Sequence, residues 1–445
     1  MKREAKLGMA KRTDGGLKIA VIGGGSSYTP EIVEGLISRY ERFPVRELWL
    51  ADIESGKSKL ETVGGLAKRM VDRAGVPIDV RLTLDRRRAI EGADFVLTQI
   101  RVGQLEARKW DERIPLRHGV IGQETTGPGG MMKALRTIPV ILDICRDMEE
   151  LAPEAWLLNF TNPAGMVTEA VTRFSGVKGV GLCNAPIHLL KWLSRKYGVP
   201  AERVYVEFVG LNHLHWATRI VIDGEDKLAE VLEQGEAYAG KNVPEMMWDP
   251  EFLRGMGGLP SYYLKYYYLT DAMLADQMAS LQSHGTRAEE VQRVEEELFE
   301  LYRNPELREK PKQLERRGGA YYSEAAVNLM DALHNDKRDI QTLNVPNGRT
   351  LDFLPPDAVI EVNCVVTGLG PIPLPVSVVP EQAKGLIAAV KSYERLTIEA
   401  ALTGDRSIAL QAMASHPLVP SVSTAKALLN EMLEQNREYL PAFFR

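Results

Sequence analysis

Short apolar runs of strand length alternate with amphipathic stretches through the first 200 residues. The strand-like runs cover residues 17–23, 47–52, 78–84, 94–100, 155–161 and 179–183. Helices are predicted over residues 29–40, 55–74 and 130–151. Strands that are apolar throughout and separated by helices are typical of a parallel sheet covered on both faces. The pattern therefore predicts an α/β fold with a Rossmann-like, doubly wound parallel sheet over residues 17–200.

The pattern changes after about residue 200. Residues 204–224 (VYVEFVGLNHLHWATRIVIDG) resemble adjacent strands of an antiparallel sheet. Long helical segments are predicted over residues 262–302 and from residue 381 to the C-terminus. We therefore expect a second, α+β domain over residues 201–445, and an N-terminal extension over residues 1–16. A ligand cleft is expected between the domains, at the carboxyl ends of the parallel strands.

Composition and charge exclude several classes of protein. The chain has 55 Lys and Arg against 60 Asp and Glu, a formal net charge of −5, so no positive excess holds a polyanion. No run approaches the roughly 18 apolar residues of a membrane-spanning helix. Cys145, Cys183 and Cys364 are too few and too far apart for a disulfide framework, which suits a reducing compartment. We expect a cytoplasmic protein that binds neither nucleic acid nor a membrane.

The segment Gly23-Gly24-Gly25-Ser26-Ser27 lies between the first predicted strand and the first predicted helix. There, free backbone N–H groups and the positive end of a helix bind a dinucleotide pyrophosphate. The first two glycine positions of G-x-G-x-x-G are filled, but Tyr28 stands at the third. The segment is predicted to bind a dinucleotide, although a glycine turn of this kind also occurs without one.

Asp52 ends the second predicted strand, 29 residues after Gly23. Its carboxylate is placed to accept hydrogen bonds from the adenosine ribose hydroxyls, which favours NAD over NADP. An alternative is that Asp52 caps the helix that begins near residue 55. The sequence leaves both roles open.

Four further segments are rich in reactive side chains: residues 101–125 (RVGQLEARKWDERIPLRHGVIGQET), 157–165 (LLNFTNPAG), 181–186 (GLCNAP) and 210–215 (GLNHLH). Together with VIGGGSSYTPE at 21–31 and SYYLKYYY at 261–268, they resemble glycoside hydrolase family 4, the NAD-dependent and metal-dependent glycosidases. The resemblance runs from about residue 18 to at least residue 287. It implies an enzyme that binds NAD and a divalent metal, in this family usually manganese.

By this resemblance, Cys183 and His213 are the metal ligands. A thiolate and an imidazole leave coordination positions open for two substrate hydroxyl oxygens. His215 is interpreted as a packing residue or one that supports the metal site. The resemblance also implies that Tyr263 is the catalytic base, with Tyr262 as the alternative. Glu124 matches a residue that increases the basicity of this tyrosine.

The resemblance implies that Arg108, Asn162 and Arg287 bind the substrate. Guanidinium groups suit a sugar phosphate because they give paired, charged hydrogen bonds. Asn184 follows Cys183, where α-specific members have an aspartic acid that protonates the leaving oxygen. The asparagine form resembles the β-specific 6-phosphoglucosidases and is expected to bind substrate. Protonation of the leaving group then needs water or another residue.

The resemblance implies a 6-phospho-β-glucosidase that acts on small phosphorylated β-glucosides such as cellobiose 6-phosphate. Bound NAD⁺ would oxidise C3, Tyr263 would remove the C2 proton, the aglycone would leave, water would add, and NADH would reduce C3 again. Family members are commonly homodimers or homotetramers, and we expect the second domain to carry substrate, metal and subunit contacts. Two alternatives remain: a net NAD-dependent hydroxy-acid dehydrogenase of the lactate or malate type, and a nucleotide-binding regulator without turnover.

Overall fold

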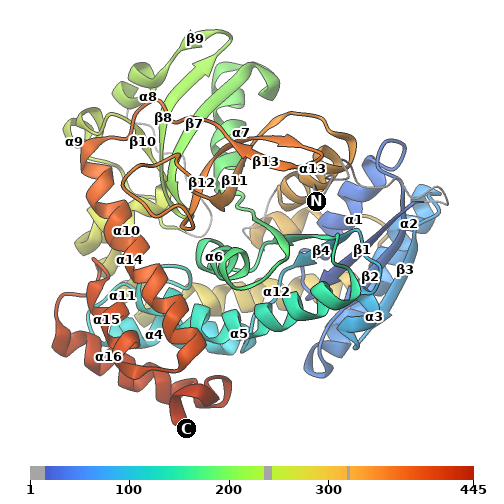
Figure 1. Cartoon of the computed structure of the whole chain (residues 1–445), viewed down its shortest axis with the longest axis horizontal. Helices are drawn as coiled ribbons and strands as arrows, with labels where there is room; N and C mark the ends of the chain where they lie inside the picture. Colours follow the sequence, from blue (N-terminus) through green and yellow to red (C-terminus); the bar gives the residue numbers. More distant parts are fainter. Residues whose placement is uncertain (1–15, 235–242, 318–320) are drawn as a thin grey trace, which may run out of the picture.

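The structure, a computed structural model, describes residues 16–234, 243–317 and 321–445. The predicted N-terminal extension over residues 1–16 lies outside the described residues, apart from Gly16. The described part contains a nine-stranded sheet and a smaller four-stranded sheet, with helices around both (Figure 1).

Six parallel strands form the larger part of the nine-stranded sheet, in the order β3-β2-β1-β4-β5-β6. In a doubly wound sheet of this order, the direction of winding reverses between β1 and β4. The strands are β1 (Leu17–Ile22), β2 (Val45–Ala51), β3 (Asp79–Thr83), β4 (Phe95–Thr98), β5 (Trp156–Asn159) and β6 (Lys178–Gly181). The predicted Rossmann-like parallel sheet is confirmed, and all six strands fall within two residues of the apolar runs.

The parallel strands are buried on both faces because alternate residues enter two separate apolar clusters. In β1, Ile19 and Val21 belong to the larger cluster, whereas Ala20 and Ile22 belong to the smaller one. Successive residues of a strand point to opposite faces, so burial of both faces favours apolar residues at most positions of the strand. The helices of this half are α1 (Thr29–Ser38), α2 (Lys57–Ala74), α3 (Arg86–Ile90), α4 (Gln104–Arg117), α5 (Gly127–Leu151), α6 (Ala164–Phe174) and α7 (Ala185–Tyr197).

Three strands from the C-terminal half complete the larger sheet. β11 (Ile340–Pro346) pairs antiparallel with β6, and β12 (Val359–Thr367) and β13 (Gly370–Pro373) continue the sheet beyond it. Antiparallel strands commonly extend an otherwise parallel sheet at its edge. The larger sheet therefore contains residues from both sides of position 200.

The smaller sheet is built around a hairpin of β7 (Val204–Leu211) and β8 (Leu214–Ile222). The short strands β9 (Glu225–Asp226) and β10 (Leu259–Pro260) both pair with β8. Asn212 and His213 join the two long strands, and His213 has a left-handed φ of 63°. The antiparallel strands predicted over residues 204–224 are confirmed.

The hairpin is docked onto the larger sheet through Asn363 of β12. The Oδ1 atom of Asn363 accepts the backbone N–H of Phe208 at 2.8 Å, and its Nδ2 atom donates to the carbonyl oxygen of Val206 at 2.9 Å. Both partners are residues of β7, so one side chain replaces the backbone ladder that would join two strands of one sheet. Because buried backbone groups need partners, this contact fixes the position of the hairpin.

The helical segment predicted over residues 262–302 is divided in the structure. Gly285, with a φ of 96°, follows α11, and Thr286 begins α12 through a capping box with Glu289. The segment from residue 381 is likewise divided into three α-helices. The helices of this half are α8 (Leu228–Gln234), α9 (Pro250–Gly255), α10 (Lys265–Tyr268), α11 (Thr270–Ser283), α12 (Arg287–Arg303), α13 (Tyr322–Asn335), α14 (Glu381–Thr403), α15 (Arg406–Ser415) and α16 (Val422–Gln435). Short 3-10 helices are η1 (Glu54–Gly56), η2 (Ala201–Arg203), η3 (Tyr262–Leu264), η4 (Lys312–Arg317), η5 (Arg437–Tyr439) and η6 (Pro441–Phe444).

A buried ion pair fastens the C-terminal helices to the N-terminal half. Arg136 of α5 donates two hydrogen bonds to the carboxylate of Asp111 of α4, at 2.9 and 2.6 Å. It donates a third, at 2.7 Å, to the side-chain oxygen of Asn436, the residue after α16. Buried charges are tolerated only when they are paired and hydrogen-bonded, so Arg136 fixes these three segments relative to one another.

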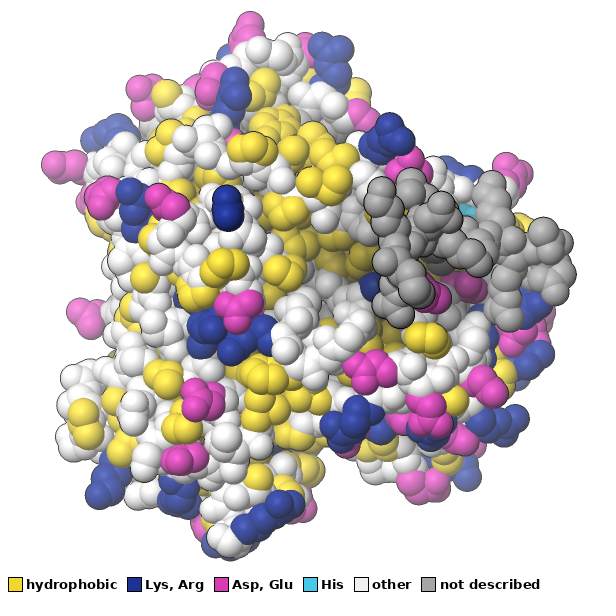
Figure 2. All heavy atoms as spheres, in the orientation of Figure 1, with side chains coloured by type: hydrophobic (Ala, Val, Ile, Leu, Met, Phe, Trp, Pro, Cys, Tyr) yellow, Lys and Arg dark blue, Asp and Glu magenta, His cyan; other side chains and the backbone are white. Residues whose placement is uncertain are grey.

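The surface carries charges of both signs. Figure 2 shows basic and acidic side chains interspersed over one face of the molecule, in keeping with the formal net charge of −5. Among the described helices, none has both the length and the apolar composition that crossing a membrane requires.

We expect Asn363→Ala to lower the free energy of unfolding by about 2–4 kcal/mol. The substitution leaves the Phe208 N–H and the Val206 carbonyl buried without partners. Urea unfolding followed by circular dichroism measures the change. The control is Asn430→Ala, which removes only an exposed hydrogen bond with Arg406 and should change the free energy by less than about 0.5 kcal/mol. Equal midpoints for the two variants would contradict the docking role of Asn363.

Candidate active site

A cavity of about 740 Å³ extends from the loop after β1 to the turn of the β7–β8 hairpin. It lies at the carboxyl ends of the parallel strands, where the winding of the sheet reverses and where ligands bind in folds of this kind. Most of the predicted site residues line it: Gly23, Gly25, Ser26, Asp52, Arg108, Glu124, Asn162, Cys183, Asn184, His213 and Tyr263. The other three, Gly24, Ser27 and Arg287, lie outside this lining.

The loop between β1 and α1 requires its glycines because the turn is crowded. Gly23 has a φ of 89°, and a Cβ atom there would lie 2.8 Å from the carbonyl oxygen of Gln99. A Cβ atom on Gly24 would lie 2.7 Å from the Cβ atom of Leu50. The glycines therefore allow the loop to pack directly against the neighbouring segments, where any side chain would clash.

Asp52 ties the end of β2 to this loop. Its Oδ2 atom accepts the backbone N–H of Gly25 at 2.8 Å, and its Oδ1 atom accepts the N–H of Ile53 at 2.9 Å. A carboxylate oxygen accepts more than one hydrogen bond, so both oxygens retain capacity for a ligand. Contact with a ribose stays a prediction.

Ser26 and Ser27 face different surroundings. Ser26 accepts the N–H of Tyr28 at 3.3 Å and lines the cavity. Ser27 is buried against α12, where its hydroxyl donates to Glu295 at 3.2 Å and its carbonyl oxygen accepts the hydroxyl of Tyr302 at 2.8 Å. Ser27 therefore holds the loop against the second half of the chain.

Cys183 lies between β6 and α7. Its Sγ atom accepts the backbone N–H of Ala185 at 3.4 Å. Burial raises the pKa of the Cys183 thiol well above its usual range, and the charge of Glu361 adds to this effect, whereas the Ala185 N–H and the Asn212 side chain oppose it. A thiol in such a setting becomes a thiolate when a metal cation takes the place of its proton.

His213 enters the cavity from the hairpin turn. Its Nδ1 atom lies 2.9 Å from the hydroxyl of Thr125, whose own hydrogen is donated to Gln123 at 2.8 Å. Because that hydroxyl has a single hydrogen, it accepts from His213, which assigns the ring proton to Nδ1 and leaves Nε2 with a free lone pair. Burial lowers the pKa of His213 to about 4. The ring is thus neutral at pH 7, the form that binds a metal.

Cys183 and His213 fit a metal site that a bound ligand completes. Within residues 16–234, 243–317 and 321–445, no group of three or more His, Cys, Asp and Glu side chains is placed to hold a metal. A cation held by one thiolate and one imidazole keeps open positions for substrate oxygens.

Tyr263 stacks on His213, with ring centroids 3.8 Å apart and an angle of 8° between the planes. It lines the cavity, whereas the neighbouring Tyr262 lies outside the lining. Burial raises the pKa of Tyr263 well above 10, with further contributions from Cys183 and Glu124, while the charge of Arg108 lowers it. Tyr263 can act as a base only when a nearby cation offsets the cost of burying its anion.

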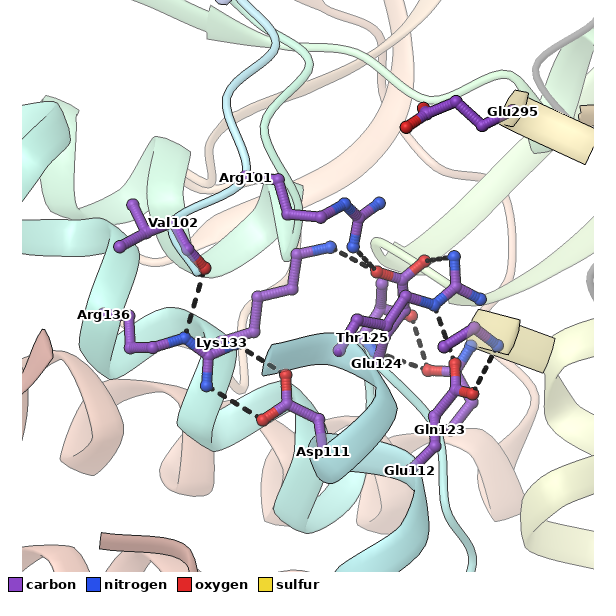
Figure 3. Close-up of polar contacts among 12 residues, drawn as sticks. Arg101, Val102, Asp111, Glu112, Gln123, Glu124, Thr125, Lys133, Arg136 and Glu295 are labelled. Atoms are coloured by element: carbon purple, nitrogen blue, oxygen red, sulfur yellow. Dashed lines mark hydrogen bonds and ion pairs between the residues drawn. The ribbon is translucent and has the colours of Figure 1, made fainter. Parts of the chain in front are cut away.

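Glu124 is surrounded by three cations, as Figure 3 shows for Arg101 and Lys133. Its carboxylate pairs with Arg101, with Arg108 at 2.8 Å and with Lys133 at 2.6 Å. Burial opposes ionisation, but these three charges hold the pKa of Glu124 well below its usual range. Burial and the charge of Arg101 lower the pKa of Lys133 to about 7. Arg108 also pairs with Glu112, so the cluster holds three basic and two acidic side chains, and the basic ones suit an anionic ligand.

Arg287 lies beside a second cavity of about 240 Å³, which Arg108 also lines. Arg287 begins α12 and pairs with Glu290 at 2.7 Å. The N–H of Ala288 donates to Glu112 at 2.7 Å, and the other oxygen of Glu112 accepts from Arg108 at 2.7 Å. Arg287 is therefore absent from the main cavity but is connected to it through Arg108.

Two asparagines line the main cavity. Asn162 follows β5, and Asn184 lies between Cys183 and α7, with its Nδ2 atom 3.4 Å from Nε2 of His188. A carboxamide carries no acidic proton, so position 184 supplies hydrogen bonds and no general acid.

Four residues of this region were not predicted from the sequence: Arg101, Thr125, Lys133 and Glu361. Arg101 and Thr125 lie in the segment 101–125, in which Arg108 and Glu124 are the predicted site residues. Lys133 and Glu361 are charged residues in the otherwise apolar segments GPGGMMKAL and VIEVNCVV. A charge within a buried element is a detectable signal, because such charges are kept only when they are paired.

Comparison with known proteins identifies the family. The sequence model of family 4 glycosyl hydrolases matches residues 18–199, and that of the C-terminal domain of these enzymes matches residues 208–419. The probable 6-phospho-β-glucosidase of Bacillus subtilis is 55% identical over 434 residues, 96% of this chain and 98% of that protein. The 6-phospho-β-glucosidase of Escherichia coli is 46% identical over 435 residues, 96% of this chain and 97% of that protein.

Comparison with solved structures supports the same family. The 6-phospho-β-glucosidase of Thermotoga maritima, solved with NAD and glucose-6-phosphate, has a TM-score of 0.88 at 37% identity and covers 96% of this chain and 99% of its own. A lactate dehydrogenase from a deep-sea metagenome has a TM-score of 0.54 at 14% identity, covering 87% of this chain and 99% of its own, a likeness of fold alone. Since the family matches both halves and close relatives span nearly the whole length, the chain belongs to glycoside hydrolase family 4.

Proposed function

We propose that this chain is a 6-phospho-β-glucosidase that hydrolyses phosphorylated β-glucosides such as cellobiose 6-phosphate, with NAD and Mn²⁺ as cofactors. One observation carries the proposal: a single cavity is lined by the glycine loop, Cys183, His213 and Tyr263. Dinucleotide, cation and base can therefore act on one sugar ring. The names of the relatives at 55% and 46% identity support the substrate class. The Thermotoga maritima enzyme solved with manganese, NAD⁺ and glucose-6-phosphate supports the cofactors.

Gly23, Gly25 and Asp52 would hold NAD, and Cys183 and His213 would hold the metal. When bound, the two cofactors supply oxidation of the C3 hydroxyl and a positive charge that polarises the resulting ketone and lowers the pKa of nearby acids. Cys183 supplies a negative donor, and His213 a neutral one that Thr125 keeps in the required tautomer.

Tyr263 would take the proton from C2, which a ketone at C3 makes acidic. Its stack on His213 fixes the ring beside the metal ligand, and the charge of Glu124 contributes to a more basic phenol. Loss of the aglycone from C1, addition of water and return of the hydride then complete a hydrolysis without net redox change. The distant dehydrogenase shares the fold but is not a comparable source of function at 14% identity.

Arg108, Asn162 and Arg287 would bind the sugar phosphate. Arg108 lines both cavities, so a phosphate that points from the main cavity into the second meets Arg108 and Arg287 together. Asn184 supports specificity for the β-anomer of the substrate, because α-specific members have an aspartic acid at this position.

Hydrolysis of nitrophenyl 6-phosphoglucosides tests the proposal. We expect release of nitrophenol from the β-linked compound only, and only with Mn²⁺, catalytic NAD⁺ and a thiol reductant. Reaction in deuterated water should place deuterium at C2 of the product, because Tyr263 exchanges the C2 proton with solvent. Accumulation of NADH in proportion to product would support a dehydrogenase instead. Binding of NAD without any turnover would support a regulator.

We expect Thr125→Val to raise the Mn²⁺ concentration for half-maximal activity about 10- to 100-fold. The isosteric change removes the acceptor for the Nδ1 proton of His213 and so releases the orientation of the ring. Thr126→Val is the matched control, because the hydroxyl of Thr126 contacts Tyr267 at 2.8 Å and not His213. The same Mn²⁺ requirement in both variants would show that Thr125 does not orient His213.

We also propose that the enzyme acts in the cytoplasm as a homodimer or homotetramer. The three cysteines are free and buried, which suits a reducing compartment. Light scattering of the purified protein should give the mass of two or four chains, and the mass of one chain would contradict this assignment.

A further inference from the structure

Glu361 of β12 is a fully buried carboxylate that no step of the proposed mechanism uses. Its Oε1 atom accepts hydrogen bonds from the side chains of Asn212 at 3.1 Å and Asn344 at 2.9 Å. Its Oε2 atom lies 2.6 Å from Nδ1 of His215. Asn212 and His215 lie on either side of His213 in the hairpin, so Glu361 contacts this turn both before and after His213.

The same carboxylate is connected to the segment that carries Cys183. Asn344 of β11 stands opposite Glu361 in the β11–β12 register and opposite Gly181 in the β11–β6 register. Gly181 is the last residue of β6, two positions before Cys183, and a Cβ atom there would lie 2.9 Å from the Cβ atom of Asn344. Asn212 also acts on the Cys183 thiol through its side chain. Glu361 is thus connected both to the segment that carries Cys183 and to the turn that carries His213.

The charge at this point matters as much as the geometry. A divalent cation with one thiolate and one neutral imidazole leaves a net charge of +1 in a buried site. Buried charges are costly unless an opposite charge compensates them. Glu361 contacts the residues on both sides of His213 in the hairpin, whereas the carboxylate of Glu124 is paired with Arg101, Arg108 and Lys133.

We propose that Glu361 is a positioning residue for the metal site: a buried anion that sets the spacing of the Cys183 and His213 segments and offsets the charge of the divalent cation between them. This inference rests on the proposed metal-dependent function. It assigns a role in metal affinity to β12, a strand of the larger sheet whose residues are not among those that line the cavity.

The variant Glu361→Gln distinguishes the proposed role in metal affinity from a purely structural role of Glu361. Glu361→Gln keeps the shape and the Oε1 acceptor for Asn212 and Asn344 but removes the charge. If the charge compensates the cation, the affinity for Mn²⁺ falls about 10- to 100-fold, as for other residues that support metal ligands. Saturating Mn²⁺ should then restore turnover, which loss of structure would not allow.

The control is Glu207→Gln. Glu207 is a buried carboxylate of β7 in the same hairpin, and it accepts hydrogen bonds from the hydroxyls of Thr218 at 2.8 Å and Ser377 at 2.7 Å. The substitution removes an equal charge from the same hairpin, away from the turn. We expect the Kd for Mn²⁺ of this variant to stay within about twofold of wild type.

In the experiment, Mn²⁺ is added to each protein in the presence of NAD, and the concentration of free Mn²⁺ is measured by electron paramagnetic resonance. A parallel titration with Co²⁺ follows the thiolate-to-metal absorption band, which Cys183→Ser should abolish. The inference is supported if only Glu361→Gln shifts both titrations. It is overturned if Glu361→Gln binds Mn²⁺ as tightly as wild type, or if Glu207→Gln weakens binding equally.

Two further outcomes are decisive. If Glu361→Gln does not fold, Asn344→Ser, which removes one donor to Glu361, should weaken Mn²⁺ binding several-fold, and an unchanged Kd would overturn the inference. If the wild-type protein itself binds no Mn²⁺, the proposed cofactor fails and this inference falls with it. Loss of β-glucosidase activity with intact Mn²⁺ binding would instead overturn the proposed substrate and leave the role of Glu361 standing.

Discussion

The contact between the β7–β8 hairpin and β12 is the constraint on which the active site depends. Cys183 follows a strand of the parallel sheet and His213 lies in a hairpin of the smaller sheet, so the two side chains line one cavity only if the sheets are held at a fixed spacing. Asn363 supplies this spacing by bonding the backbone of β7 at Phe208 and Val206. Glu361, on the same face of β12, continues the contact to the turn.

The cavity is built from buried charges that are each compensated locally. Glu124 neutralises part of the charge of Arg101, Arg108 and Lys133, and the remainder is available to an anionic substrate. Glu361 is kept apart from these cations and faces the hairpin turn. The basic side chains around Glu124 suit a phosphate, and the carboxylate of Glu361 beside the hairpin turn suits a divalent cation.

The sequence predicted most of the sheet and only part of the helices. Strands buried on both faces are mostly apolar and are therefore easy to predict, whereas α4 carries many charges and buries Arg108 and Glu112 as an ion pair, so its helical pattern of apolar residues is weak. The break at Gly285 is not predicted from the sequence, because the residues on both sides of it favour helix. Strands β11 to β13 were missed as members of the larger sheet, because no local pattern reports a pairing between residues 181 and 344.

The candidate site followed from motifs wherever a residue lies in a loop at the end of a strand, as Cys183 and Asn162 do. Arg287 lies in an adjoining cavity instead, because its position depends on how α12 packs against α4, which sequence does not specify. The contacts of Glu361 could not be predicted from the sequence for the same reason. Apart from Asn344, its partners Asn212 and His215 lie more than 140 residues away in the chain.

The similarity in fold to a lactate dehydrogenase shows which part of the structure could distinguish net oxidation from hydrolysis. Both chains share the doubly wound sheet, at 14% identity, so the dinucleotide crevice itself does not decide between net oxidation and hydrolysis. Here the hairpin turn adds an imidazole opposite a strand-end thiol and stacks that imidazole on a phenol. A hydride acceptor alone releases an oxidised product. In the proposed mechanism, a cation held by His213 and a base at Tyr263 would let the oxidised ring lose its C2 proton before the hydride returns, and the glycosidic bond would break in that interval. The proposed mechanism would then depend on the position of His213, and therefore on β12, the strand that anchors its turn.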